Sequence, residues 1–159
     1  MKERIGFVGL GKMGAPMSRN LMKAGHQVAA YDVDASRIAA LADSGARAAA
    51  SPAEAASGAA ITITMVPDSP DVEAAVAGAG GVIEGAGRGS VVIDMSTIAP
   101  ATSRSLAARL AQRGVEMLDA PVTGGVVGAE NATLSIFVGG DRAVFERCLP
   151  VLQLMGRTV

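Results

Sequence analysis

Three glycines near the N-terminus have the spacing of a loop that binds phosphate groups. The loop fits the pattern G-x-G-x-x-G and consists of Gly9, Leu10, Gly11, Lys12, Met13 and Gly14. In such loops the first glycine makes a tight turn, the second lets a pyrophosphate approach the backbone, and the third lets a helix pack closely on a strand. Free N–H groups at the start of the helix then bind the anion. We therefore predict that these six residues contact a dinucleotide.

An acidic residue follows the loop at the distance expected for a ribose-binding carboxylate. Asp32 lies 21 residues after Gly11, close to the usual separation of about 20. Its carboxylate could accept hydrogen bonds from both ribose hydroxyls and would repel a 2′-phosphate, which favours NAD and leaves NADP possible. Two alternatives stay open. Asp32 could only cap the next helix, and Arg37, one helical turn further on, could meet a 2′-phosphate or simply lie in solvent.

Two further apolar runs end in residues that suit the rest of a dinucleotide. Ligands of parallel sheets bind beyond the carboxyl ends of the strands. Met65 and Val66 offer an apolar wall for adenosine or nicotinamide, while Ser96 and Thr97 offer hydroxyls near the ring end. We predict cofactor contacts at Met65, Val66 and Thr97, and a substrate contact at Ser96. Met65 could instead belong to the core, and Ser96 and Thr97 could cap the helix expected after them.

A third run ends in Thr123, Gly124 and Gly125. One hydroxyl and two unobstructed N–H groups suit a carboxylate, so we predict that these residues bind substrate. A simple turn at the two glycines is the alternative.

The sequence contains few other groups for chemistry. One cysteine, Cys148, and one histidine, His26, exclude a disulfide framework, a cysteine-cluster metal site and a histidine-rich metal site. We expect His26 in a surface turn, Cys148 packed in the last helix, and no metal. A net charge of −1 and 3% aromatic residues argue against nucleic acid as a partner. No signal peptide or membrane-spanning stretch is visible, so a cytoplasmic location is expected.

The elements that must position these residues alternate between strands and helices. Strands are expected over residues 4–8, 27–31, 46–50, 60–66, 90–94, 115–118 and 132–138. Helices are expected over residues 12–24, 35–44, a short segment from 51, 71–77, 100–113 and 141–154. The alternation predicts an α/β fold, a Rossmann-like doubly wound and mostly parallel sheet, in one domain over residues 1–159. The glycine-rich segment 78–89 is interpreted as a connection, because no strand precedes it.

Four stretches together resemble the β-hydroxyacid dehydrogenase family, the 3-hydroxyisobutyrate dehydrogenase group related to 6-phosphogluconate dehydrogenase. The stretches are residues 5–14, 94–98, 119–125 and 133–140. The resemblance implies that the first stretch binds the dinucleotide and that Thr97 lies by the cofactor. It also implies that Thr123, Gly124 and Gly125 bind the substrate carboxylate, with Thr in place of the commoner Ser. In the family a catalytic lysine lies on a long helix after this domain, followed by an all-helical C-terminal domain. We therefore expect no catalytic residue in this chain, with the lysine beyond Val159.

The expected function is that of the NAD-binding domain of a 3-hydroxyacid dehydrogenase, with a homo-oligomeric state. Hydride would pass between the nicotinamide and a small 3-hydroxy acid such as 3-hydroxyisobutyrate, or tartronate semialdehyde in the reductive direction. The alternative is a truncated, non-catalytic dinucleotide-binding module. A lysine encoded shortly after Val159 would favour the enzyme, and a stop codon there would favour the module.

Overall fold

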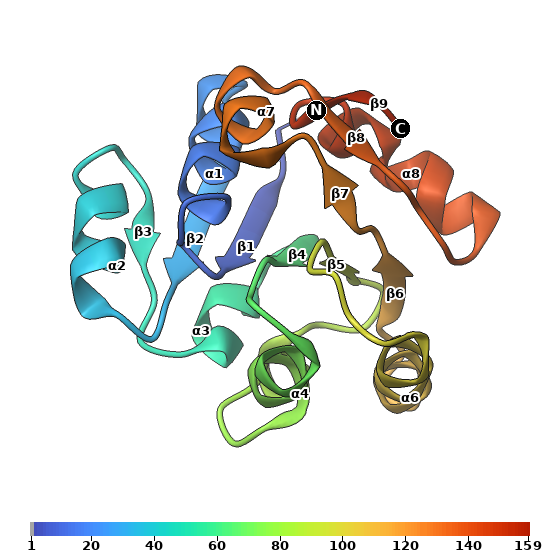
Figure 1. Ribbon diagram of the computed structural model, residues 1–159. Helices are drawn as coiled ribbons and strands as arrows, with labels where there is room; N and C mark the ends of the chain where they lie inside the picture. The colour runs from blue at the N-terminus through green and yellow to red at the C-terminus, as the bar shows by residue number, and fades with distance from the viewer. Residues whose placement is uncertain (1) are drawn as a thin grey trace.

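The central feature of the computed structural model, which describes residues 2–159, is a six-stranded parallel sheet. Its strand order is β3-β2-β1-β4-β5-β6 (Figure 1). The strands are β1 (Arg4–Val8), β2 (Gln27–Tyr31), β3 (Arg47–Ala48), β4 (Ile61–Thr64), β5 (Val91–Asp94) and β6 (Glu116–Asp119). The chain first moves outward from β1 to β3 and then crosses back to β4. Ligands of such sheets bind where the order reverses, here between β1 and β4, beyond the carboxyl ends of the strands.

Helices cover both faces of the sheet (Figure 1). One face carries α1 (Gly14–Lys23), α7 (Gly125–Asn131) and α8 (Arg142–Leu152), with α2 (Ala35–Ala42) beside α1 and β3. The other face carries α3 (Pro52–Ala56), α4 (Ser69–Ala77), α5 (Val82–Gly85) and α6 (Pro100–Ala111). Short polar side chains begin several of these helices: Ser51 caps α3, Asp68 caps α4 and Asp141 caps α8. The predicted fold class is confirmed.

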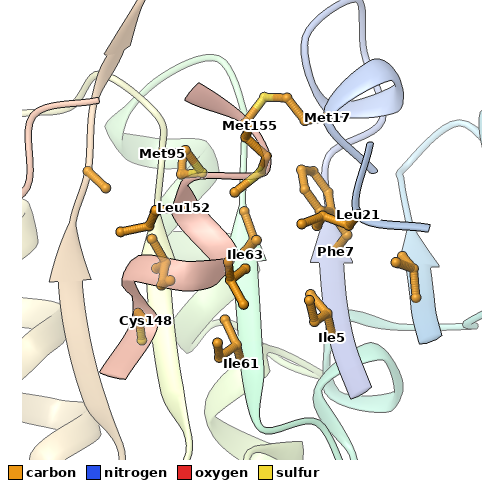
Figure 2. Packing of buried hydrophobic residues seen from close by; sticks show 14 of the residues in the cluster. Ile5, Phe7, Met17, Leu21, Ile61, Ile63, Met95, Cys148, Leu152 and Met155 are labelled. Atoms are coloured by element: carbon orange, nitrogen blue, oxygen red, sulfur yellow. The ribbon is translucent and has the colours of Figure 1, made fainter. Parts of the chain in front are cut away.

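The core follows from the alternation of side chains along the strands. Figure 2 shows Ile5 and Phe7 of β1 beside Ile61 and Ile63 of β4, packed against Met17 and Leu21 of α1 and against Cys148 and Leu152 of α8. The opposite face of the sheet packs a second cluster made of Val8, Val72, Val76, Val92, Leu106 and Leu110. Every residue of β4 and β5 is buried, as expected for parallel strands covered on both sides. These strands form a rigid base for the loops at their ends.

The strand expected over residues 132–138 does not join the main sheet. It is shortened to β8 (Leu134–Ile136), which pairs antiparallel with β7 (Val122–Thr123) and parallel with β9 (Gly156–Thr158) in a separate three-stranded sheet. Strands β7 and β9 cannot be predicted from the sequence, because runs of two or three residues carry no periodicity.

Two helices were also not predicted. The segment 78–89, interpreted as a connection, contains α5, and the residues after Gly124 form α7. Helix α7 begins at Gly125 and contains Gly128. Because glycine has a low helix propensity, the sequence of this segment does not predict a helix. No helix within residues 2–159 is long and apolar enough to cross a membrane.

Candidate functional site

The glycine loop has the backbone geometry that its sequence predicts. Gly9 adopts a φ of +101°, and a Cβ there would clash with the carbonyl of Met65, the residue directly after β4. A Cβ at Gly14 would clash with the carbonyl of Gly9 and press on Phe7. Gly9 and Gly14 therefore serve the fold itself, since they let α1 lie against the ends of β1 and β4.

Gly11 is different, because a Cβ there would clash with no described residue. Of residues 2–159 only Arg37 comes within 4 Å of that Cβ position, with its Nη1 at 3.9 Å. Helix α1 begins at Gly14 without a side-chain cap. The N–H of Ala15 donates to the carbonyl of Gly11 and Pro16 has no N–H, but the N–H groups of Gly11, Lys12 and Met13 have no hydrogen-bond partner among residues 2–159. A partly exposed loop with unpaired N–H donors is a suitable binding site for a pyrophosphate. The residues present therefore fit a dinucleotide.

Asp32 links the end of β2 to this loop. Its Oδ2 accepts a hydrogen bond of 2.7 Å from the N–H of Leu10, and its Oδ1 accepts one of 2.8 Å from the N–H of Asp34. Helix α2 is capped by Asp34, whose carboxylate accepts from the N–H of Ser36. The alternative that Asp32 only caps the next helix is therefore wrong. Its carboxylate is instead held beside the glycine loop.

Arg37 lies against the same carboxylate. Its Nη1 is 3.7 Å from Oδ1 of Asp32, and its Nε is 3.8 Å from Oδ2 of Asp34. The side chain of Arg37 is 51% exposed, so it lies both in solvent and over the loop. Of the two alternatives for Arg37, the position in solvent is confirmed in part by this exposure, and the contact with a 2′-phosphate stays a prediction.

The ends of β4 and β5 lie side by side and are joined by polar side chains. The N–H of Val66 donates to Oγ of Ser96 over 2.9 Å, and Oγ1 of Thr64 donates to Oδ1 of Asp94 over 2.8 Å. Ser96 is 1% exposed, whereas Thr97 is exposed. Helix α6 has Ala99 at its N-cap and no side-chain cap, so Ser96 and Thr97 do not cap it.

The apolar wall predicted at the end of β4 is partly accessible. Met65 and Val66 are both half-buried, with Met65 packed against one hydrophobic core and Val66 against the other. Met65 therefore belongs to the edge of the core and also borders the glycine loop, where its carbonyl faces Gly9. Both interpretations of this residue are compatible with its position.

Thr123 is the last residue of β7, Gly125 is the first residue of α7, and Gly124 lies between them; all three are exposed. Gly124 has a φ of +132° and Gly125 a φ of +62°, values that favour glycine. Gly124 is the N-cap of α7, so these glycines form a helix entry and not a simple turn.

A long-range hydrogen bond attaches α7 to the glycine-loop helix α1. Nδ2 of Asn20 in α1 donates to the carbonyl of Ala129 in α7 over 2.8 Å. The bond joins residues 109 positions apart in sequence, and nothing in the local pattern around Asn20 predicts it.

The remaining candidates for chemistry are structural. Nδ1 of His26 accepts the N–H of Glu3 over 3.0 Å, at the end of the sheet opposite the glycine loop. Cys148 is fully buried, and burial raises the pKa of its thiol. A hollow of about 920 Å³ lies near His26 and Arg147, away from the glycine loop. Within residues 2–159 no group of three or more His, Cys, Asp or Glu side chains could hold a metal ion.

Comparison with known proteins identifies the family. Residues 4–159 match the family model described as the NAD binding domain of 6-phosphogluconate dehydrogenase. The chain belongs to this family. It is an NAD-binding domain of the Rossmann type, in agreement with the resemblance that the sequence motifs indicated.

Similar proteins of this family are known in sequence and in structure. The chain is 43% identical over 155 residues to a 3-hydroxyisobutyrate dehydrogenase of Pseudomonas aeruginosa, covering 98% of this chain and 52% of the relative. A solved 3-hydroxyisobutyrate dehydrogenase of Mycobacterium tuberculosis with L-serine superposes with a TM-score of 0.91 at 38% identity, covering 99% of this chain and 53% of that one. Psf3 in complex with NADP+ and 2-OPP gives a TM-score of 0.91 at 31% identity, covering 98% and 55%. The chain thus spans about half the length of these relatives.

Proposed function

We propose that this chain is the cofactor-binding part of an NAD-dependent 3-hydroxyacid dehydrogenase. The observation that carries the proposal is the loop at Gly11. The N–H groups of Gly11, Lys12 and Met13 have no hydrogen-bond partner among residues 2–159, and of these residues only Arg37 comes within 4 Å of a Cβ built at Gly11. Asp32 supports it, because the Leu10 N–H holds this carboxylate beside the loop at 2.7 Å. A pyrophosphate and the adjoining ribose need these two features together.

The residues of the loop, from Gly9 to Gly14, would bind the pyrophosphate, and Asp32 would accept the ribose hydroxyls. Met65, Val66 and Thr97 would face the nicotinamide half. When bound, the dinucleotide supplies a hydride acceptor or donor. We propose a preference for NAD over NADP, because the carboxylate of Asp32 would repel a 2′-phosphate. The guanidinium of Arg37, 3.7 Å from that carboxylate, would moderate the repulsion.

The substrate would bind through its carboxylate to Thr123, Gly124 and Gly125. Both glycines have positive φ values, and a Cβ at Gly125 would meet no described residue within 4 Å, so a ligand could approach the backbone closely. Ser96 stays a proposed substrate contact, although its hydroxyl accepts the Val66 N–H in this structure. We propose a small 3-hydroxy acid such as 3-hydroxyisobutyrate, or tartronate semialdehyde in the reductive direction, with a lysine beyond Val159 as proton acceptor.

The test is a calorimetric titration of the 159-residue chain with NADH and NADPH, beside nicotinamide absorbance with 3-hydroxyisobutyrate and related acids. We expect NADH to bind more tightly than NADPH and no turnover, because general acid–base help alone is worth roughly 10²–10⁴-fold in rate. Failure to bind NADH would refute the proposal. Enzyme-like turnover would show that the catalytic group lies within this chain.

We also propose self-association and a cytoplasmic location. Val126, Val127 and Phe137 are large apolar side chains that are 38%, 67% and 62% exposed. Exposed apolar groups of this kind favour contact with another protein surface. Sedimentation at several protein concentrations checks the association, and a single monomeric species throughout would contradict it.

A further inference from the structure

Asp94, the last residue of β5, is a buried carboxyl group that the proposed function does not use. It is 0% exposed. Its Oδ1 accepts two hydrogen bonds, one of 2.8 Å from Oγ1 of Thr64 and one of 3.2 Å from the N–H of Ser96. Asp94 thus contacts the end of β4 on one side and the segment after β5 on the other.

Ser96 extends this connection. Its Oγ accepts the N–H of Val66 over 2.9 Å. Together Thr64, Asp94, Ser96 and Val66 form a closed set of bonds, which we call the strand-end clasp. The clasp joins β4 and β5 at their carboxyl ends, next to the switch point of the sheet. Met65 and Thr97, the residues proposed to face the nicotinamide half, are its immediate neighbours in sequence.

Packing alone does not explain an acid at this position. Oδ2 of Asp94 is buried without a hydrogen-bond partner among residues 2–159, and so is Oδ1 of Asp119, its register partner on β6. Unpartnered buried polar atoms cost free energy, whereas an apolar side chain would not. Two residues earlier on the same strand, the fully buried position 92 carries a valine. The acid therefore has a role that a hydrophobic residue could not fill.

We propose that Asp94 is a positioning residue for the nicotinamide half of the cofactor. Asp94 accepts hydrogen bonds from the Thr64 hydroxyl and from the Ser96 N–H. These bonds fix the position of the segment that contains Met65 and Val66 relative to the segment that contains Thr97. Asp94 acts through these two segments, because its buried Oδ1 is bonded to Thr64 and to the Ser96 N–H. A small displacement of the groups that position a ligand can weaken its binding strongly. This inference rests on the proposed function, since it presupposes that a nicotinamide dinucleotide binds at these strand ends.

The test compares NADH with ADP-ribose, which lacks the nicotinamide ring. Both ligands are titrated against the unmodified chain, Asp94→Ala and Asp94→Asn. We expect Asp94→Ala to weaken NADH binding about tenfold while ADP-ribose binding stays within about twofold. Asp94→Asn keeps an oxygen that can accept from Thr64 and Ser96, so its NADH affinity should stay within about twofold of the unmodified chain.

Val92→Ala is the matched control, because it removes buried volume from the same face of β5 without breaking the clasp. It should lower stability and leave the ratio of NADH to ADP-ribose affinity unchanged. If Asp94→Ala does not fold, Thr64→Val removes one donor of the clasp and should weaken NADH alone by about threefold.

Three results would overturn the inference. The first is an equal effect, or no effect, on both ligands in Asp94→Ala or in its substitute Thr64→Val. The second is a loss in Asp94→Asn as large as in Asp94→Ala. The third is a changed affinity ratio in Val92→Ala. Failure of the proposed function is distinguishable from all three, because the unmodified chain would then not bind NADH.

Discussion

Replacing Gly11 by valine tests the site with little disturbance of the fold. Gly11 has no positive φ, and a Cβ at this position meets only Nη1 of Arg37, at 3.9 Å, among the described residues. The branched side chain would therefore occupy the space in which a pyrophosphate should lie. The same change at Gly9 or Gly14 would be uninformative, because a Cβ there clashes with backbone.

The expected loss follows from the contacts that the valine would block. A hydrogen bond to a charged group contributes about 1.5–3 kcal/mol. Displacing the pyrophosphate from one backbone N–H would thus raise the dissociation constant by about 10- to 150-fold, since each 1.4 kcal/mol is tenfold. The thermal midpoint of the free protein should change little.

The assay is calorimetric titration with NADH, with circular dichroism to compare the folds. Gly87→Val is the matched control, because Gly87 is exposed and a Cβ there meets no described residue within 4 Å. Gly87→Val should bind NADH like the unmodified chain. Unchanged NADH affinity in a folded Gly11→Val variant would refute the placement of the cofactor on this loop.

Three further predictions concern affinity and stability. Asp32→Ala should weaken NADH binding and reduce or reverse the preference for NADH over NADPH. Tighter binding of NADPH than of NADH by the unmodified chain would contradict the role proposed for Asp32. Ala132 adopts a left-handed φ of 55°, so Ala132→Gly should raise the free energy of unfolding in urea by about 1 kcal/mol; a loss of stability would contradict this. Burial raises the pKa of Asp94, and the nearby Asp119 adds to the shift. The folded state therefore keeps its proton while the unfolded state ionises, so the free energy of unfolding should fall as pH rises from about 4 through the raised pKa. Burial also raises the pKa of Asp119, which Asp94→Asn retains, so this variant should show a smaller fall in urea titrations across pH. An identical pH dependence in the two proteins would refute the assignment.

The amino-acid sequence by itself determined the fold class and the residues of the glycine loop. Its strands and helices carry strong local signals, such as the apolar run that becomes β4 and the serine and proline that open α3. Gly9, Gly11 and Gly14 are recognisable because their spacing within one short loop matches the dinucleotide-binding pattern, and Asp32 because its distance from them is set by one helix and one strand.

Only the tertiary structure decided how residues far apart in sequence act together. The Asn20 bond to Ala129, the Arg37 contact with Asp32 and the strand-end clasp around Asp94 all join separate elements. The small second sheet is of the same kind, because β7 and β9 exist only through pairing with β8. Local periodicity reports which face of an element is buried, but it carries no information on which side chain of another element lies opposite. Pairings of that kind are determined by the packing of the whole chain.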